Sequence, residues 1–489
     1  PSFETARGCP FQCTFCDQGL DETKIVSFST KRMCDELNYV AEKITKFSGT
    51  WSIAFHDSNW GMYKKDVDLS DHILKLINEK NWPISIEIST PKNKRQQILD
   101  IDRKLKNRVG VNLAQQSMNN ETLKIIKRDN MTNNQYVDFI RELESRDKVP
   151  GCELIIPLPN ETKQTYFDSV KILIDAGVLI GTYTLLMNQG AELGRHEAIK
   201  KYGLKSKWRI VPRDFGTYRG KKVFDVERVC VGTNTMPYKD YLECRRFSFL
   251  IHLFTYSVFF PLKKLIKKEL NISFFDFVWC VFQNLEKNNN QKHLNSNFSK
   301  FYFEFSNECE EELFESKKDI YDYYSNDENY KKLLNSELGD NLLRKYSAKM
   351  ICNVLSEVID FSIDLIPKMI SEEIMKKEEI KSILESSRLW LTNLYIFDAI
   401  FDWEKEKNNE TIINLEYDVP SWYINDQKSI LNFKKRINYK MVYNKRNEYL
   451  KNEIITLHGK EDKIYAVGKY FHQMSTNSDD IKKTSVQVS

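Results

Sequence analysis

The sequence lacks any apolar run long enough to cross a membrane, and it has no large excess of charge of one sign. Its longest apolar run, Phe247–Leu262, contains His252 and Pro261 and falls short of the roughly 20 residues that a membrane helix needs. The 489 residues include 73 Lys and Arg against 69 Asp and Glu, a formal charge of +4. Such a balance disfavours a protein that wraps DNA or RNA, so we expect no membrane span and no nucleic-acid partner.

A secretory leader and internal repeats are also missing from the printed sequence, and we therefore expect a cytoplasmic protein. Hydrophobic residues make up 41% of the chain and charged residues 29%, which is typical of globular domains. In the cytoplasm the ten cysteines favour a metal or redox role over disulfides.

Three of the ten cysteines lie together near the start of the chain. Cys9, Cys13 and Cys16 have the spacing C-x-x-x-C-x-x-C, and Gly8 and Pro10 suit a tight loop around them. The other seven have no neighbour at ligand spacing and are expected to be small buried residues: Cys34, Cys152, Cys230, Cys244, Cys280, Cys309 and Cys352.

Three close thiolates suit some metal sites better than others. A structural zinc site takes four ligands, and no nearby Cys or His supplies the fourth. A [4Fe-4S] cluster held by three cysteines leaves one iron open for a substrate or cofactor. The spacing therefore favours a catalytic cluster. Two alternatives stay open: a non-catalytic zinc-binding or partner-binding protein, and an iron–sulfur protein that only transfers electrons.

The cysteine string resembles the signature of the radical S-adenosylmethionine (radical SAM) enzymes, C-x-x-x-C-x-aromatic-C, with Phe15 as the aromatic residue. The resemblance implies that Cys9, Cys13 and Cys16 ligate the cluster and that S-adenosyl-L-methionine binds the open iron, with Phe15 near the cofactor. It further implies reductive cleavage to a 5′-deoxyadenosyl radical, which abstracts hydrogen from a small-molecule or biosynthetic-intermediate substrate. The expected electron donor is a flavodoxin or ferredoxin.

Strand-like and helix-like stretches alternate after the first residues. Six strands are expected, with helices between them: Ser2–Gly8, Trp51–Phe55, Ile84–Ile88, Arg108–Leu113, Cys152–Pro157 and Leu179–Met187. Strands that alternate with helices form parallel sheets, and right-handed crossovers curl such a sheet. The pattern thus predicts an α/β fold, a partial (β/α)6 barrel, which is also the fold that the radical SAM resemblance implies.

Polar residues gather where the expected strands end, which is the face that carries active sites in β/α barrels. Asp57 and Asn59 follow the second strand, and Gln116 and Ser117 follow the fourth. They are candidate partners of a polar cofactor. Each is also compatible with an ordinary turn or helix cap, as are Asn160 and Thr162 after the fifth strand.

Several of these stretches resemble a radical SAM subgroup that often carries an N-terminal cobalamin-binding domain. The segments are FHDSNWGM, LAQQSMNNETLKIIKR and ELIIPLPNET, with Pro157 where the subgroup usually has glycine. The resemblance covers roughly residues 2–235 and implies that Gln116, Ser117 and Arg128 line the S-adenosylmethionine pocket. Arg128 is alternatively a solvated helix residue. We expect a cobalamin domain before Pro1, and methyl transfer to an unactivated carbon as the reaction.

The second half of the chain changes in character, with sparse glycine and proline and frequent aromatic residues. We expect a radical SAM core over 1–235, an α-helical domain over 236–405, and a small α/β appendix with a polar tail over 406–489. A long apolar helix followed by a basic one is expected over Arg245–Lys268, and a further helix over Gln427–Arg436. The acidic, tyrosine-rich stretch Asp319–Tyr324 suits either a helix surface that packs its rings or the lining of a polar cleft.

Overall fold

The computed structural model describes residues 1–19, 25–44, 52–146, 148, 150–288, 296–371, 378–394, 410–425, 428–442, 482 and 485–488. These form two compact units. The first comprises Pro1–Lys207 with Arg228–Cys244, and the second comprises Trp208–Glu227 with Arg245–Ser489. No helix in the described ranges is both long and apolar enough to span a bilayer.

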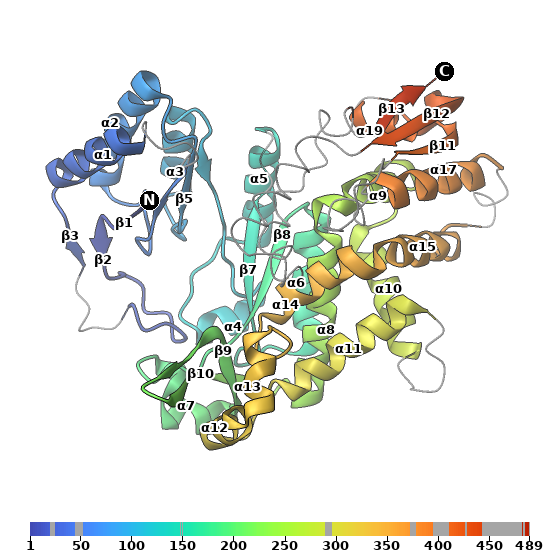
Figure 1. The fold of residues 1–489 in the computed structure, drawn as a ribbon. Coiled ribbons are helices and arrows are strands. Elements are labelled where there is room, and N and C mark those ends of the chain that lie inside the picture. Colours follow the sequence, from blue (N-terminus) through green and yellow to red (C-terminus); the bar gives the residue numbers. More distant parts are fainter. Residues whose placement is uncertain are drawn as a thin grey trace. The chain divides into compact units, whose positions relative to one another are not determined.

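Parallel strands form the centre of the first unit (Figure 1). One sheet has the order β1-β4-β5-β6, with all three pairings parallel, and β7 pairs with β8 in parallel. Parallel bridges from Asn112 to Gly151 and from Gln116 to Leu154 connect the two sheets. The strands are β1 (Ser2–Phe3), β4 (Ser52–Phe55), β5 (Ser85–Ile88), β6 (Val109–Gly110), β7 (Gly151–Ile156) and β8 (Leu179–Thr184). The expected six strands and their parallel direction are confirmed.

Helices alternate with these strands, which confirms the α/β class. They are α1 (Thr30–Ile44), α2 (Lys64–Lys80), α3 (Arg95–Lys104), α4 (Asn120–Ile125), α5 (Asn133–Glu144), α6 (Lys163–Asp175) and α7 (His196–Tyr202). No closed barrel is found in the part of the chain that the structure describes, so the partial barrel stays a prediction.

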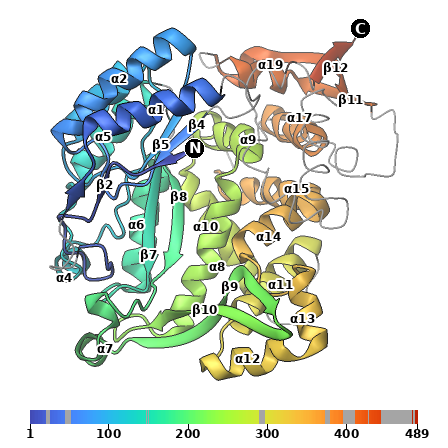
Figure 2. The same ribbon diagram turned by 60° about the vertical axis from the view of Figure 1, so that its left-hand side comes forward.

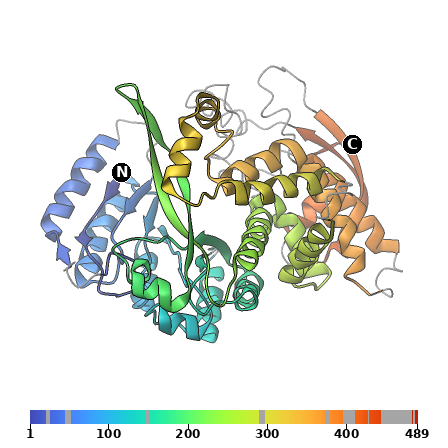
Figure 3. The same ribbon diagram turned by 90° about the horizontal axis from the view of Figure 1, so that it is seen from below.

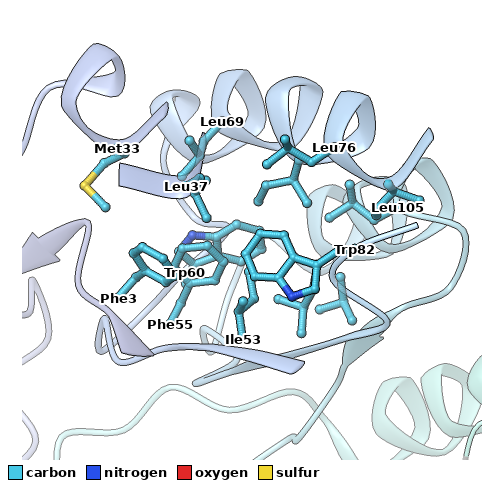
Figure 4. Close-up of a cluster of buried hydrophobic side chains, with 14 of the residues drawn as sticks. Phe3, Met33, Leu37, Ile53, Phe55, Trp60, Leu69, Leu76, Trp82 and Leu105 are labelled. Carbon is cyan, nitrogen blue, oxygen red and sulfur yellow. The ribbon is translucent and has the colours of Figure 1, made fainter. Parts of the chain in front are cut away.

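A hydrophobic layer joins α1 and α2, which lie side by side in Figure 2, to the sheet. Along β4, Ile53 and Phe55 are buried whereas Ser52 and Ala54 are half-buried, because successive side chains of a strand point to opposite faces. Figure 4 shows Ile53 and Phe55 beneath the leucines of the two helices. Trp60 stacks on Phe55 with ring centroids 4.7 Å apart, which fixes the loop that follows β4.

The first expected strand, Ser2–Gly8, is divided in the structure. β1 ends at Phe3, and β2 (Ala6–Arg7) pairs antiparallel with β3 (Val26–Ser27) instead of joining the parallel sheet. The division has a local cause, since the Asp57 carboxylate takes the backbone N–H groups that follow β1. The cysteine loop leaves from β2 and returns to β3.

A long hairpin that the sequence pattern does not predict contributes to both units. It consists of β9 (Lys205–Tyr218) and β10 (Lys221–Gly232). Gly220, with φ of +77°, lies in its turn and takes a left-handed conformation that favours glycine. Within the second unit, Ile210 and Phe224 pack against Ile320 and Leu333. Figure 3 shows the green hairpin as a long two-stranded ribbon.

From Arg245 to Leu394 the described part of the second unit is mainly helical. Its helices include α8 (Tyr238–Phe254, shared with the first unit), α9 (Phe260–Lys264), α10 (Phe274–Asn288), α11 (Asn297–Glu311), α12 (Lys317–Ser325), α13 (Asp327–Leu334), α14 (Leu342–Lys349), α15 (Leu355–Leu365) and α17 (Glu378–Leu394). The apolar helix followed by a basic one, expected over Arg245–Lys268, is confirmed, because α8 ends at Phe254 and a separate helix, α9, begins the basic stretch. Pro261 lies in the first turn of a separate helix, α9, where the missing N–H of proline does no harm.

The C-terminal part forms an antiparallel sheet of β11 (Glu410–Tyr417), β12 (Lys434–Val442) and β13 (Ser485–Val488). α19 (Val419–Ile424) lies between the first two strands in sequence. The helix predicted over Gln427–Arg436 is wrong, because a short 3-10 turn at Ile430–Phe433 leads directly into β12, which pairs with β11 along most of its length. The rest of the predicted polar tail lies outside the described residues.

Candidate functional site

The three clustered cysteines lie on the loop between β2 and β3. The N–H of Cys16 donates to the carbonyl of Cys13 at 3.0 Å, so the two residues share a tight turn. Thr14 anchors this turn at both backbone groups, donating to Ile126 O at 3.2 Å and accepting from Leu193 N at 2.8 Å. The loop is therefore fixed to segments that follow the fourth and sixth parallel strands.

These cysteines supply the right donor atoms, although they do not stand in a ligating arrangement. All three are free thiols, and burial raises the pKa of Cys16. No group of three or more His, Cys, Asp or Glu within the described ranges is placed to hold a metal ion. Three thiols on one short loop fit a [4Fe-4S] cluster with one open iron in number and kind. Assembly of the cluster then requires that the three sulfurs converge.

Asn59 and Asp57, both predicted cofactor partners, hold the cysteine loop in different ways. Asn59 Nδ2 donates to Cys9 Sγ at 3.2 Å, so it contacts a thiol directly. The buried Asp57 carboxylate accepts from Thr5 N at 2.8 Å, Ala6 N at 2.6 Å and Thr5 Oγ1 at 2.5 Å. Asp57 thus fixes the segment that leads into the loop.

The first turn of α2 supports both of these residues. Asp66 Oδ2 accepts from Gly61 N at 2.9 Å and Tyr63 N at 3.1 Å, closing the loop that carries Asn59. Burial raises the pKa of Asp66 to about 6. Lys65 Nζ donates to the Thr5 carbonyl at 2.7 Å, and burial lowers the pKa of Lys65. The sequence pattern assigns neither residue a role.

Lys92, in the polar stretch that follows β5, is a further residue of this site. Its Nζ lies 3.0 Å from Cys13 Sγ and 4.2 Å from the ring centroid of Phe11. Lys92 therefore contacts two residues of the cysteine loop at once. Its position in the sequence indicates this role, because Lys92 is the last residue of the polar stretch Ser89–Lys92 after β5.

Gln116 presents an unsatisfied acceptor at the end of its strand segment. Its backbone bonds to β7, with Gln116 N donating to Glu153 O at 2.8 Å and Ile155 N donating to Gln116 O at 2.9 Å. Its φ of +67° is unusual for a residue with a side chain. The buried Oε1 has no hydrogen-bond partner among the described residues. A buried acceptor without a donor is costly, so this atom fits a ligand that brings an N–H or O–H group.

Ser117 connects two of the strand-end stretches through Glu161. Ser117 Oγ donates to Glu161 Oε2 at 2.5 Å, and Thr165 Oγ1 donates to Glu161 Oε1 at 2.8 Å. Burial raises the pKa of Glu161 to about 7. Thr162 caps α6 by accepting from Thr165 N at 3.1 Å, as its cap interpretation predicts. The sequence places Glu161 in a recognisable stretch but does not predict this buried carboxylate bridge.

Arg128 lies beside the cysteine loop, and Phe15 belongs to that loop, between Cys13 and Cys16. Arg128 donates to the Ala114 carbonyl and, at 2.9 Å, to Asn130 Oδ1. Burial lowers the pKa of Arg128, and the nearby Cys13 thiol opposes this shift. Arg128 is therefore held beside the loop and is not a freely solvated side chain. Phe15 is half-buried against the cluster that contains Leu123 and Leu158.

The sequence matches the model of the Radical SAM superfamily over residues 3–173. It is 27% identical over 257 residues to the cobalamin-dependent radical SAM methyltransferase TokK of Streptomyces tokunonensis. It is 24% identical over 252 residues to a 2-(S-pantetheinyl)-carbapenam-3-carboxylate methyltransferase of Streptantibioticus cattleyicolor. The matches cover 51% and 50% of this chain. The chain spans about a third of the length of these curated relatives, 36% in each case.

Two solved structures are also similar. One is the methyltransferase TsrM from Kitasatospora setae with cobalamin and a [4Fe-4S] cluster bound, at 17% identity and a TM-score of 0.36, covering 42% of this chain and 39% of that one. The other is OxsB with aqua-cobalamin and S-adenosylmethionine bound, at 12% identity and a TM-score of 0.38, covering 80% and 58%. The match confirms the resemblance to radical SAM enzymes that the cysteine string carries, over residues 3–173.

Proposed function

We propose that this chain is the catalytic part of a radical SAM enzyme in which Cys9, Cys13 and Cys16 hold a [4Fe-4S] cluster. The observation that carries the proposal is the group of three free thiols on one loop, contacted by Asn59 and Lys92 from the ends of two neighbouring strands. When bound, the cluster and S-adenosylmethionine together supply a 5′-deoxyadenosyl radical that abstracts hydrogen from a small-molecule substrate.

The chain's own residues have three tasks in this proposal. Lys92 contacts Cys13 and Asn59 contacts Cys9, so both side chains orient the cysteine loop. Gln116 offers its unpartnered Oε1 to an N–H or O–H group of S-adenosylmethionine, and Arg128 stays beside the loop as a fixed positive charge. Curling of the six strands into a partial barrel would bring these strand ends around one cavity and exclude water from it.

Methyl transfer is the reaction that the relatives favour. Both curated relatives are methyltransferases, and TokK is described as cobalamin-dependent. We infer that cobalamin is bound by a segment outside the printed sequence, and that a small electron-transfer protein such as flavodoxin or ferredoxin reduces the cluster. The substrate is then a small molecule with an unactivated carbon as the methyl acceptor.

Anaerobic reconstitution with iron and sulfide tests the cluster. We expect about four irons and four sulfides per chain, and 5′-deoxyadenosine by mass spectrometry after addition of reductant and S-adenosylmethionine. Cys13→Ala should abolish both signals, whereas the matched variant Cys34→Ala, on α1, should retain both. Stoichiometric zinc in place of iron, or equal iron loading of the two variants, would contradict the proposal.

A further inference from the structure

The three clustered thiols have different hydrogen-bond donors. Cys9 Sγ accepts from the neutral amide of Asn59 at 3.2 Å, and Cys16 Sγ accepts from a backbone N–H at 3.5 Å. Cys13 Sγ accepts instead from the ammonium group of Lys92 at 3.0 Å. A hydrogen bond from a charged donor is roughly twice as strong as one between neutral groups. Cys13 is thus the thiol that a lysine side chain addresses directly.

The charge of Lys92 is not compensated by a carboxylate. No Asp or Glu among the described residues forms an ion pair with its ammonium group, which lies 4.2 Å from the ring centroid of Phe11. Lys92 is half-buried, so solvent screens its charge only in part. The charge therefore acts on Cys13 and on any group that Cys13 binds.

The position of Lys92 is set by its own segment as well as by the cysteine loop. Thr90 Oγ1 accepts from Asn112 N at 3.0 Å, which ties the stretch after β5 to the segment after β6. Pro91, directly before Lys92, is buried. Lys92 also contacts the cysteine loop at two points. We therefore expect the contact with Cys13 to persist when the three thiols converge on a cluster.

A positive charge at this place has a defined effect on an iron–sulfur cluster. The reduction potential of such a cluster depends on its net charge and on hydrogen bonds to its sulfurs. When it takes up one electron from a reduced electron-transfer protein, the cluster gains one negative charge, and no bond forms or breaks. A fixed cation beside a ligand sulfur stabilises the more negative, reduced state. Loss of this cation would therefore lower the potential.

We propose that Lys92 raises the reduction potential of the cluster held by Cys9, Cys13 and Cys16, through its hydrogen bond and its charge at Cys13. Because it acts through a ligand sulfur, Lys92 is a positioning residue and takes no part in bond breaking. The inference rests on the proposed function, since it needs a cluster on these thiols. It adds the side chain that adjusts how readily the electron donor reduces that cluster.

Redox titration of the anaerobically reconstituted full chain, followed by electron paramagnetic resonance, tests the proposal. The samples contain no S-adenosylmethionine, so the measurement does not depend on turnover. For Lys92→Met we expect the equilibrium constant of one-electron reduction to fall at least about tenfold, a downward shift of about 59 mV. Lys92→Arg, which keeps a charged donor, should recover most of the shift. An unchanged potential in iron-loaded Lys92→Met would overturn the proposal.

A matched variant separates the contact at Cys13 from the loss of one positive charge. Lys94→Met removes the same charge two residues further along, at an exposed position. It should leave the potential unchanged, because solvent screens a charge at the surface. A shift as large as that of Lys92→Met would contradict the proposal, because the change in net charge would then explain both results.

Iron and sulfide analysis of each sample distinguishes this inference from the proposed function. If the parent chain assembles no cluster, the proposed function is wrong and this inference is wrong with it. If only Lys92→Met fails to load iron, Lys92→Gln, which keeps an N–H donor without the charge, takes its place and should shift the potential in the same direction. Loss of iron in both variants would also overturn the proposal, since Lys92 would then serve assembly of the cluster and not its potential.

Discussion

The two units hold their polar groups in different ways. In the first unit, the loops after the strands place single polar atoms against backbone and thiols, as Asn59 does with Cys9, and leave Gln116 Oε1 without a partner. In the second unit, half-buried carboxylates pair with basic side chains, as Glu286 does with Arg246 at 2.8 and 3.0 Å. The Gln116 acceptor is thus available to a ligand, whereas the charges of Glu286 and Arg246 already compensate each other.

The largest effect is expected for Asp57→Ala, which removes the anchor of the cysteine loop in the first unit. The carboxylate accepts three hydrogen bonds from Thr5 and Ala6, and their donors would be left buried and unsatisfied. We expect the free energy of unfolding to fall by about 4 kcal/mol, together with reduced iron loading, because the cysteine loop loses its anchor. Chemical denaturation and iron analysis measure the two effects. Full iron loading in a destabilised variant would show that the anchor is structural only.

The corresponding change in the second unit is Lys345→Met. Lys345 is 6% exposed and pairs with Glu308, so its removal leaves a largely buried carboxylate without its cation. We expect a loss of about 3 kcal/mol in unfolding free energy, without any change in iron loading. A change in iron loading of the same size as for Asp57→Ala would contradict the assignment of separate roles to the two units.

Glu161→Gln tests how the buried carboxyl of the first unit makes stability depend on pH. Burial raises the pKa of Glu161 to about 7 from its ordinary value of 4.5, so between these two pH values the folded state holds a proton that the unfolded state has lost. The carboxyl therefore contributes stability fully below about pH 4.5, and this stability is lost as pH rises to about 7. At pH 8 we expect the variant to be more stable than the parent by up to about 3 kcal/mol, with little difference at pH 4. Denaturation from pH 4 to 8 measures this, and parallel pH profiles would refute it.

The smallest effect is expected for Thr162→Ala, which removes the cap of α6. Loss of an N-cap side chain costs about 1 kcal/mol, and iron loading and production of 5′-deoxyadenosine should not change. If instead the variant loses activity while its stability is unchanged, Thr162 belongs to the site and the cap interpretation is insufficient.

The parts of the molecule that the sequence predicts are those set by local periodicity or spacing. The parallel strands follow from short apolar runs, and the cysteine loop from the interval between Cys9 and Cys16. The β9–β10 hairpin was not predictable in this way, because Pro212 interrupts β9 and its packing partners lie about a hundred residues away in α12 and α13. The interaction of Lys92 with Cys13 likewise depends on a contact across 79 residues. The unpartnered Gln116 acceptor depends on a backbone angle that no motif encodes.

The shared hairpin also determines how this chain can be shortened. The backbone passes between the units at Lys207–Trp208, Glu227–Arg228 and Cys244–Arg245, so no single cleavage separates them cleanly. A chain that ends at residue 235 would keep Ile210 and Phe224 but lose the helices that cover them. The resulting apolar surface would favour aggregation. Excision of the radical SAM domain therefore requires the hairpin arm to be trimmed or its apolar side chains to be replaced.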